Sequence, residues 1–313
     1  MFKGHCACLL ICLSALPAFA ASPTRPAITL IVKSRLNAYF KDMMAVAEAH
    51  ARSHANEYSL KIRGVPWETD LELQKQQLEQ ALQDRPDAIV IAPIDTSALV
   101  PLLKKAIKQG IIVIDIDNKL DDQALAQAGI QIPFVGPSNR AGTRLAGEYV
   151  ARQLRPDDEV AIMEGVVSAV NSQSRTAGYE DAMQTQGMRI VAQPSGEWEI
   201  APAEKVASEL ISAHPKLKAI LCDNDNMAIG TVQALRKAGK IGKILVTGYD
   251  HTLQIRPYIE RGEVLATVDQ FGGQQAVAGI ELALRSLKQR IPQNSLPAIQ
   301  QTPVKLVTRD AAK

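Results

Sequence analysis

The segment Ala219–Leu235, AILCDNDNMAIGTVQAL, predicts a strand, a turn and a helix in direct succession. It opens with four apolar residues, which is typical of a strand buried on both faces of a parallel sheet. Apolar residues then recur at the i, i+4, i+7 spacing of one helical face, at Ala228, Val232 and Leu235. Between the two elements stand three polar residues, Asp223, Asn224 and Asp225. One of them would suffice to cap the helix, so the others suggest a further role.

Three other stretches end an apolar strand in the same way, with carboxylates or amides. They are AIVIAPID (Ala88–Asp95), IIVIDIDN (Ile111–Asn118) and ILVTGYDH (Ile244–His251). In open α/β sheets the ligand crevice lies beyond the carboxyl ends of the strands. Any one stretch could serve only as a helix cap, but the four together favour a cleft that binds one small molecule.

The composition is that of an ordinary globular protein. A length of 313 residues suggests two domains of roughly 150 residues each. An apolar share of 46% and a charged share of 22% argue against a disordered or fibrous chain. A formal charge of +2 and the lack of a basic stripe argue against nucleic acid or another polyanion as a partner.

The N-terminus has the pattern of a secretory signal peptide. Lys3 and His5 precede an apolar run over 6–16, and Ala18 and Ala20 place small residues three and one positions before a cut after Ala20. The apolar run is shorter than the ~20 residues that a membrane span needs. We therefore expect a signal peptide over 1–20 and a mature protein exported to a bacterial periplasm.

Cysteine usage agrees with this expectation. Cys6, Cys8 and Cys12 would leave with the signal peptide, so the mature chain would keep only Cys222. A single cysteine cannot form an internal disulfide. Because Cys222 lies within an apolar strand and is followed by acids, we expect a buried, unreactive thiol.

From Ala27 onward, short apolar strands alternate with amphipathic helices. This repetition predicts an α/β fold of two similar lobes, each a parallel sheet flanked by helices on both faces. The strands expected in the first lobe are 28–32, 58–65, 87–92 and 111–115, separated by helices. The second lobe is expected to hold strands at 159–163, 188–193, 218–222 and 243–248, and helices at 141–154, 175–187, 203–214, 227–239 and 252–262.

Three elements remain near the C-terminus, a strand at 264–268, a helix at 274–287 and a strand at 304–307. They are too few to form a third domain, so they must complete the first two lobes. The chain must then cross between the lobes more than once. Two lobes joined by several crossings form a hinge with a cleft.

The residues expected on the cleft side of this fold suit a sugar. Polar residues fall there at strand ends or helix starts, at Asp117, Asn139, Arg175, Asn224, Asp250 and Gln270. The chain is only 4% aromatic, yet four rings lie in loops beside polar residues, at Tyr39, Phe40, Trp198 and Tyr249. Rings pack on the C–H faces of a sugar, while its hydroxyls pair with carboxylates, amides and guanidinium groups.

Catalytic and cofactor motifs are not found in the sequence. There is no G-x-S-x-G, Walker loop or G-x-G-x-x-G. His50 and His54 are four residues apart and could hold a metal ion, but no third ligand is near them, so a solvated helical face is favoured. Asp115 and Asp117 could form a carboxylate pair for acid–base chemistry, although binding needs them equally. We predict no catalytic residue, no cofactor and no metal ion.

Seven motifs resemble those of a known family. They are NAYF (Asn37–Phe40), the strand-end Asp117, SNRAG (Ser138–Gly142), SRTAGY (Ser174–Tyr179), NDNMAIG (Asn224–Gly230), TGYD (Thr247–Asp250) and ATVDQ (Ala266–Gln270). In order and spacing the chain from Ala27 onward resembles the type I periplasmic sugar-binding proteins of the ribose-binding class, which deliver ligand to ABC transporters. Regulators of the LacI type share this fold, but they carry a helix-turn-helix where this chain has a signal peptide.

The resemblance implies a fold with three crossovers, near Pro137, Phe271 and Pro303. The lobes would then be 27–137 plus 271–303 and 138–270 plus 304–313. It also implies sugar contacts from the first lobe through Asn37, Tyr39, Phe40 and Asp117. From the second lobe the contacts would come from Asn139, Arg175, Trp198, Asn224, Tyr249 and Asp250, with Gln270 at a hinge strand. We also expect the protein to be a monomer.

Two residues depart from the pattern of ribose binders and are expected in the pocket. Asn118 stands where those proteins have an arginine, and Lys33 stands where they have a small hydroxyl residue. Lysine is a flexible point charge and not a planar fork, so it would select a different pattern of hydroxyls. The ligand is therefore expected to be a pentose, a hexose or a sugar alcohol, and not necessarily ribose.

Three functions are compatible with these residues. The first is a receptor that closes around a sugar and delivers it to the membrane permease of an ABC transporter. The second is a sensor subunit that binds the same kind of sugar but presents it to a chemoreceptor or kinase instead of a permease. The third, which is less favoured, is an exported enzyme that acts on a sugar through Asp115, Asp117 or Asp250.

Overall fold

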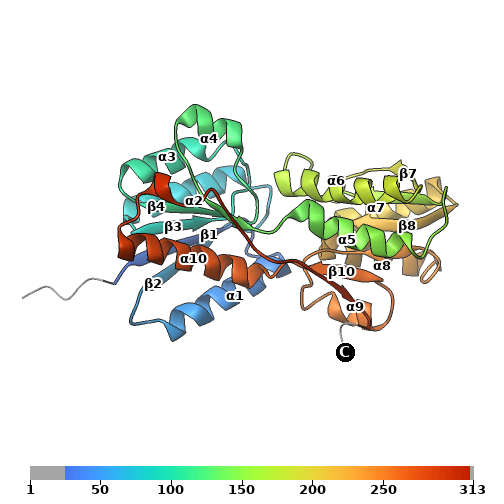
Figure 1. The fold of residues 1–313 in the computed structure, drawn as a ribbon. Coiled ribbons are helices and arrows are strands. Elements are labelled where there is room, and N and C mark those ends of the chain that lie inside the picture. Colours follow the sequence, from blue (N-terminus) through green and yellow to red (C-terminus); the bar gives the residue numbers. More distant parts are fainter. Residues whose placement is uncertain (1–24, 311–313) are drawn as a thin grey trace, which may run out of the picture.

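The computed structural model describes residues 25–310 and arranges this part of the chain as two lobes (Figure 1). The predicted signal peptide, 1–20, lies outside the described residues. None of the helices within 25–310 has the length and apolar character needed to span a membrane. Each lobe is built on one six-stranded sheet with helices on both of its faces.

The sheet of the first lobe has the strand order β11-β5-β4-β3-β1-β2. Its strands are β1 (Ala27–Val32), β2 (Ser59–Gly64), β3 (Ala88–Ile91), β4 (Ile112–Ile116), β5 (Phe134–Gly136) and β11 (Ile299–Gln301). All neighbouring strands run parallel. The carboxyl ends of these strands therefore point to one edge of the lobe, which faces the second lobe.

Side chains alternate between the two faces of each strand, so this sheet supports two cores. The first core packs Leu30, Val90 and Ile114 against α1 (Ala38–Ser53) and α10 (Gly272–Gln289). On the opposite face, the helices are α2 (Leu71–Asp84), α3 (Val100–Lys108) and α4 (Asp122–Ala128). A 3-10 helix, Gln293–Ser295, follows α10.

The sheet of the second lobe has the order β12-β10-β9-β8-β6-β7. Its strands are β6 (Glu159–Met163), β7 (Arg189–Ala192), β8 (Leu217–Cys222), β9 (Leu245–Thr247), β10 (Ala266–Asp269) and β12 (Lys305–Thr308). Helices α5 (Asn139–Ala151) and α6 (Val170–Thr185) cover one face, and α7 (Ile200–Ala213), α8 (Asp225–Lys237) and the short α9 (Arg256–Glu260) cover the other.

This second sheet is mixed and not purely parallel, which corrects the prediction. β12 runs antiparallel to β10, whereas the other neighbours are parallel. The reason lies in how β12 is reached. It arrives directly from β11 without a crossover helix, so it enters the second lobe at the edge where the other strands end.

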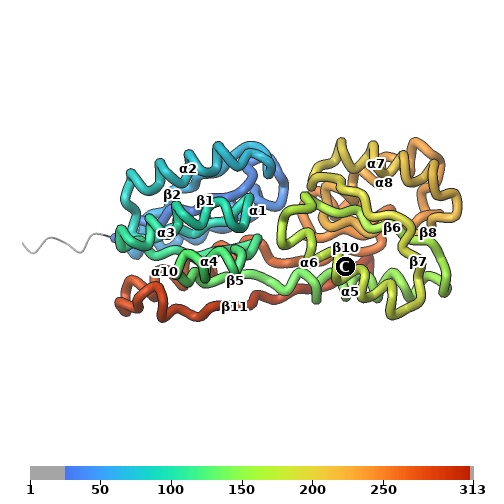
Figure 2. Tube along the Cα trace, turned by 90° about the horizontal axis from the view of Figure 1, so that it is seen from above, coloured from blue at the N-terminus to red at the C-terminus, as the bar shows by residue number. Residues whose placement is uncertain are grey.

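The chain passes between the lobes three times, after β5, after β10 and after β11. The second passage carries α10 back to the first lobe, where it packs beside α1 (Figure 1). Figure 2 shows the third passage, in which the chain leaves β11, beside β5, and runs to the second lobe. The predicted architecture, two α/β lobes joined by three crossovers, is confirmed.

Three short elements were absent from the prediction, namely α4, β5 and β11. Each of the two strands has only three residues, which is too short for a periodic signal. α4 has seven residues and is capped by Asp121, whose side chain accepts a hydrogen bond from the N–H of Ala124.

Two helices begin four or more residues from their predicted starts. α6 starts at Val170, five residues before the predicted start at Arg175. The prediction missed this start because the first turn, VNSQS, is polar, has no apolar period and has no capping side chain at its N-cap. α9 is limited to Arg256–Glu260 because the preceding residue, Ile255, is the N-cap and Pro257 lies in the first turn. Thr252 instead binds Asp225 through its N–H and its hydroxyl.

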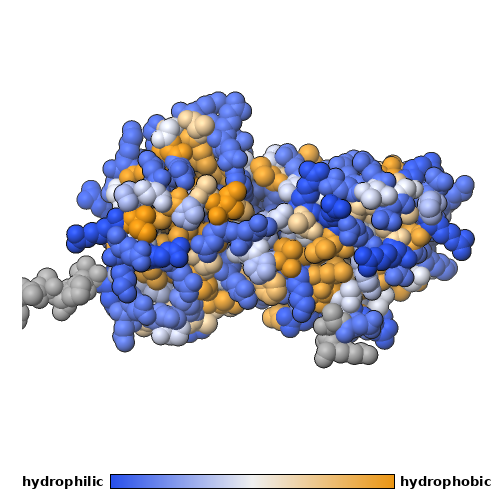
Figure 3. Space-filling model, in the orientation of Figure 1, coloured by the Kyte–Doolittle hydropathy of each residue, from blue (hydrophilic) through white to orange (hydrophobic). Residues whose placement is uncertain are grey.

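The face of the molecule in Figure 3 is mostly hydrophilic, with apolar side chains gathered in patches on both lobes. The large apolar side chains that are exposed within 25–310 are Leu36, Val46, Trp67, Leu145, Val167, Leu253 and Ile299. Four of these, Leu36, Trp67, Val167 and Leu253, lie within four residues of side chains that line the pocket between the lobes.

Candidate functional site

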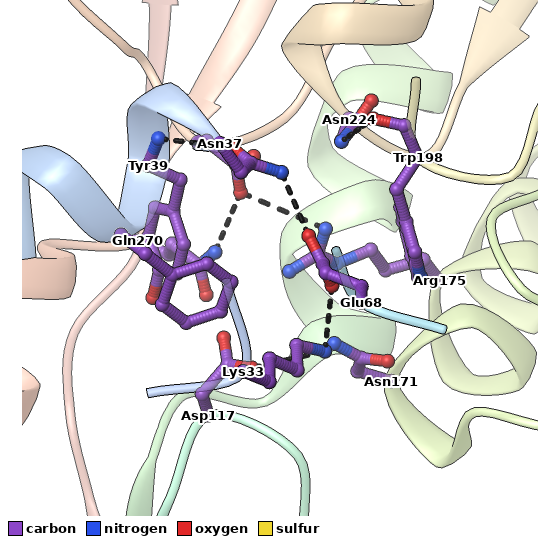
Figure 4. Close-up of a pocket in the computed structure, with 12 residues that line it drawn as sticks. Lys33, Asn37, Tyr39, Glu68, Asp117, Asn171, Arg175, Trp198, Asn224 and Gln270 are labelled. Carbon is purple, nitrogen blue, oxygen red and sulfur yellow. Dashed lines mark hydrogen bonds and ion pairs between the residues drawn. The ribbon is translucent and has the colours of Figure 1, made fainter. Parts of the chain in front are cut away.

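A pocket lies between the two lobes, where the carboxyl ends of the parallel strands of one sheet face those of the other (Figure 4). The side chains that line it are all buried and come from both lobes: Lys33, Asn37, Tyr39, Phe40, Glu68, Asp117, Asn171, Arg175, Trp198, Asn224, Asp250 and Gln270. Lys33 directly follows β1, Asp117 directly follows β4, and Gln270 directly follows β10. The topology thus brings together residues that are far apart in the sequence.

Lys33 lies between two carboxylates of the first lobe. Its Nζ is 3.2 Å from Glu68 Oε2 and 3.2 Å from Asp117 Oδ2. Burial acts to lower the pKa of Lys33, but the charges of Asp117 and Glu68 outweigh burial and raise that pKa above its usual value. Lys33 is therefore a charged ammonium group. Both carboxylates form ion pairs with this ammonium group, and the buried Asp117 Oδ2 has no hydrogen-bond partner within 25–310, so it can accept from a ligand hydroxyl.

Asn37 connects this charged cluster to an aromatic wall. Its Oδ1 accepts a hydrogen bond from the backbone N–H of Tyr39 at 3.0 Å, and its Nδ2 donates to Glu68 Oε1 at 2.7 Å. This cap begins α1 beside the pocket, where the rings of Tyr39 and Phe40 pack edge to face with centroids 4.9 Å apart. The buried Tyr39 hydroxyl has no hydrogen-bond partner within 25–310. A ligand hydroxyl would satisfy it.

Arg175 on α6 is held in place by other residues of the second lobe. Its Nε donates to Asn139 Oδ1 at 2.8 Å, and its Nη1 donates to the backbone oxygen of Asp223 at 2.7 Å. The ring of Tyr249 stacks on the guanidinium, with its centroid 3.9 Å from Cζ. Nη1 also lies 3.6 Å from Asp250 Oδ1. Among the described residues nothing bonds to Nη2, so its two N–H groups are available to a ligand.

Trp198 forms the wall of the pocket on the second lobe. Its backbone lies in the left-handed region, with φ of 67°, and its carbonyl accepts from Asn224 Nδ2 at 3.1 Å and Asn226 Nδ2 at 3.2 Å. Two amides therefore hold a strained turn in place. The ring lies 5.7 Å from Lys33 Nζ and 5.4 Å from Arg175 Cζ, measured to its centroid. It contacts cations of both lobes.

Asp250 and Gln270 form the part of the pocket nearest the second crossover. Gln270 Nε2 donates to Asp250 Oδ1 at 2.6 Å, and Gln275 Nε2 donates to the Gln270 carbonyl at 2.9 Å. Burial raises the pKa of Asp250 well above its usual value, although the charge of Arg175 opposes this effect. Asp250 has φ of 113°, so its side chain is aimed by an unusual backbone conformation.

Ten of the thirteen residues predicted for the site line the pocket, and three do not. Asn139 and Tyr249 bind and stack on Arg175 instead, so they position a pocket residue without reaching the pocket wall. Asn118 is buried beside the pocket, where its side chain bonds to backbone groups of both lobes. None of these three side chains lines the pocket.

Two pocket residues were missing from the prediction, Glu68 and Asn171. Glu68 follows β2 in the same manner as the other strand-end acids, and this signal could have identified it. However, β2 is only half buried, so its sequence lacks the continuous apolar run that marked the other strands. Asn171 lies in the first turn of α6, ahead of the predicted helix start.

The residues considered for other chemistry have structural roles. Cys222 is buried, and burial raises the pKa of its thiol to about 12, as expected for an unreactive cysteine. His50 and His54 stack with ring centroids 4.1 Å apart, and no group of three metal-ligating side chains occurs within 25–310. Asp115 does not line the pocket, and its Oδ2 accepts from the N–H of Leu120 at 2.7 Å. It therefore does not form a shared acid–base site with Asp117.

Comparisons with known proteins agree with this geometry. A family model described as a periplasmic binding protein domain matches residues 28–290. A D-ribose/D-allose-binding protein of Pseudomonas aeruginosa is 46% identical over 303 residues, which cover 96% of this chain and 95% of the relative. The D-allose-binding periplasmic protein of Escherichia coli is 30% identical and covers 93% of this chain and 94% of its own.

Solved structures match over similar lengths. An ABC transporter solute-binding protein from Burkholderia multivorans, with an unknown ligand represented as α-D-erythrofuranose, has a TM-score of 0.88 and 46% identity, covering 91% of this chain and 99% of its own. A solute-binding protein from Actinobacillus succinogenes with bound D-allose has a TM-score of 0.87 and 31% identity, covering 92% and 99%. These relatives are binding proteins and not enzymes, and this chain is likewise a binding protein. It belongs to the periplasmic binding protein family.

Proposed function

We propose that this protein is a periplasmic receptor for an aldose such as D-allose or D-ribose, which it encloses between its lobes and delivers to the membrane permease of an ABC transporter. The observation that carries the proposal is the combination of aromatic walls with two separate charged clusters, one around Lys33 and one around Arg175. Rings suit the C–H faces of a sugar, and charged groups suit its hydroxyls. Relatives that are named for ribose and allose support this choice.

The proposed contacts come from both lobes. From the first lobe we assign Lys33, Asn37, Tyr39, Phe40, Glu68 and Asp117, and from the second lobe Asn171, Arg175, Trp198, Asn224, Asp250 and Gln270. Asn139 and Tyr249 act through Arg175. A ligand that contacts both lobes binds the closed arrangement more tightly than the open one, so it shifts the population toward closure.

The hinge of this motion is assigned to the crossovers near Pro137, Phe271 and Pro303, between the lobes 27–137 plus 271–303 and 138–270 plus 304–313. The backbone of Phe271 supports the second position, because its φ of 53° marks a sharp change of direction between β10 and α10. Hinges are typically a few residues at element ends that absorb a change in backbone angles.

As part of the same proposal, the protein is exported to the periplasm, its signal peptide is cleaved after Ala20, and the mature chain from Ala21 is a monomer. Mass spectrometry of the protein recovered from a periplasmic extract tests the cleavage site, and light scattering tests the monomer. The E. coli relative is named as a periplasmic protein, which supports the compartment.

Isothermal calorimetry on the mature protein, with D-allose, D-ribose, other pentoses and hexoses, and sugar alcohols, tests the ligand. A ligand at a hundred times its Kd stabilises the fold by about 2.7 kcal/mol, so a thermal-shift screen finds candidates first. Binding of an aldose supports the receptor, whereas no binding across the library refutes it. Uptake of the labelled sugar in a deletion strain then tests delivery to a permease. Normal uptake with lost chemotaxis would favour the sensor role instead.

A further inference from the structure

The N-cap position of α6 provides no capping side chain, although the N–H of Ser172 in the first turn bonds to Asn171 Oδ1 at 3.0 Å. Its N-cap residue is Ala169, which has the extended backbone of a cap, with φ of −79° and ψ of 128°, but no side-chain hydrogen bond. Side-chain caps are present at α1, α2, α4, α5 and α8 and absent at α3, α7, α9 and α10, so α6 is distinguished not by the missing cap but by what replaces it. The first N–H groups of a helix need partners outside the helix.

The missing partner comes from the other lobe. Asn118 Oδ1, from the loop after β4, accepts a hydrogen bond from the backbone N–H of Asn171 at 3.2 Å. Asn171 is the second residue of α6, and its N–H is the one that a capping side chain usually binds. Within 25–310 no other hydrogen bond joins the two lobes away from the crossover segments.

Contacts within the first lobe hold Asn118 in place. Its backbone N–H donates to the Ile116 carbonyl at 2.7 Å, across a tight turn in which Asp117 has φ of 66°. Its Nδ2 donates to the Pro93 carbonyl at 2.9 Å. Both of these partners belong to the first lobe. The Oδ1 atom is therefore held toward the second lobe by contacts that do not depend on the cleft.

We propose that Asn118 is an affinity-determining residue that touches no sugar and acts by capping α6 from the opposite lobe when the cleft closes. In the open form the Asn171 N–H and Asn118 Oδ1 face water, and in the closed form they bond to each other in a buried site. The oxygen also lies at the positive end of the α6 dipole. The cap favours closure whichever sugar is bound, so it raises the affinity for every sugar by the same factor.

The expected size follows from the value of a helix cap, which is about 1 kcal/mol, or about fivefold in an equilibrium constant. Asn118→Ala should raise the Kd for D-allose and for D-ribose by the same factor of about five, chiefly through faster dissociation. A change in the ratio of the two Kd values would mean that Asn118 contacts ligand, and unchanged Kd values would mean that the cap is without effect. Either result overturns the inference.

A second substitution separates capping from a general loss of structure. Ala169→Ser supplies α6 with a hydroxyl cap in both the open and the closed form, so closure no longer gains from Asn118. Ala169→Ser alone should weaken binding about as much as Asn118→Ala, and the double variant should be no weaker than either single one. Additive losses would overturn the inference. Thermal unfolding without ligand checks that all variants are folded.

The proposed role of Asn118 depends on the proposed receptor function only where it is tested by measuring sugar binding. Small-angle X-ray scattering or lobe-to-lobe fluorescence transfer on the ligand-free protein tests it independently. Asn118→Ala should lower the ratio of closed to open molecules about fivefold. If no sugar binds the wild-type protein, the proposed function fails, but this measurement still decides whether the cap favours closure. An unchanged ratio would refute the cap.

Discussion

Replacing Arg175 by lysine tests the assignment of the pocket most directly. The substitution keeps a positive charge but removes the planar fork. In the native site Nε and Nη1 are used to hold the side chain, on Asn139 and on the Asp223 carbonyl, while Nη2 has no partner among the described residues. A lysine Nζ has three N–H groups, so it cannot hold those two anchors and also present two further N–H groups to a ligand.

The magnitude follows from counting donors. A hydrogen bond that involves a charged group contributes roughly 1.5–3 kcal/mol. If the ammonium replaces one of the two Nη2 donors, Arg175→Lys loses one such bond, or about 2 kcal/mol, which corresponds to about a thirtyfold higher Kd. Arg175→Ala also leaves the buried Asp250 without a cation, so its loss should reach about 3–5 kcal/mol.

Calorimetric titration of the sugar identified in the screen measures these losses. Asn139→Ala, which removes one anchor but no ligand donor, should fall between wild type and Arg175→Lys, with a loss of about 1 kcal/mol. Arg140→Lys is the matched control, because Arg140 is exposed and pairs with Asp181 outside the pocket. It should leave the Kd within about twofold. If Arg175→Lys binds within threefold of wild type, the guanidinium does not donate to the ligand and the reasoning is wrong.

Three further predictions concern the charged cluster, the pH response and the helix packing. Glu68→Gln keeps the acceptor for Asn37 but removes one of the two counter-charges of Lys33. We expect calorimetry to show about a tenfold loss of affinity, because one charged hydrogen bond to the ligand is weakened. A Kd equal to that of the wild type would mean that Glu68 is not part of the site. In this structure, where the pocket is enclosed by buried side chains of both lobes, burial first and then the charge of Glu68 on the other lobe raise the pKa of Glu199 to about 7. An open cleft would return Glu199 toward its usual value of 4.5, so closure takes up a proton and affinity should fall as pH rises from about 5 to 7 and then level off. Glu199→Gln should flatten this profile, and an affinity that rises with pH would contradict the assignment. In Gly178→Ala the new Cβ would lie 2.1 Å from Thr143 Oγ1 and 2.3 Å from the Arg140 carbonyl, so urea unfolding should reveal a loss of about 3 kcal/mol or more. Gly110→Ala, where no atom lies within 4 Å of the new Cβ, should lose only the cost of its φ of 84°, about 1–2 kcal/mol; equal losses in the two variants would contradict the packing argument.

The fold was predictable because its signal is repeated. Apolar strands that end in acids or amides recur along both lobes, and parallel topology then places those ends at one edge. The strands with three residues, β5 and β11, gave no such signal because periodicity needs more length. The antiparallel β12 could not be inferred either, since its direction depends on the path from the neighbouring lobe.

The sequence predicted which residues lie at or beside the pocket better than it predicted what each side chain contacts. Asn139 and Tyr249 lie where the sequence placed them, next to the pocket, but their side chains hold Arg175. Sequence alone does not distinguish a residue that contacts ligand from one that supports such a residue. The sequence showed no sign of the hydrogen bond between Asn118 and the Asn171 N–H for a related reason, because its acceptor lies on the other lobe and leaves no local pattern at the start of α6.

The three crossovers also determine when the first lobe can form during synthesis. Its core packs Val90 and Ile114 against α10, and its sheet ends with β11, yet both α10 and β11 follow nearly the whole second lobe in the chain. A nascent chain that has emerged only as far as β10 cannot bury that face. Contacts between such distant segments form slowly. The first lobe consequently cannot complete its core until nearly the whole chain has been synthesised, whereas most of the second lobe is continuous in sequence and precedes α10.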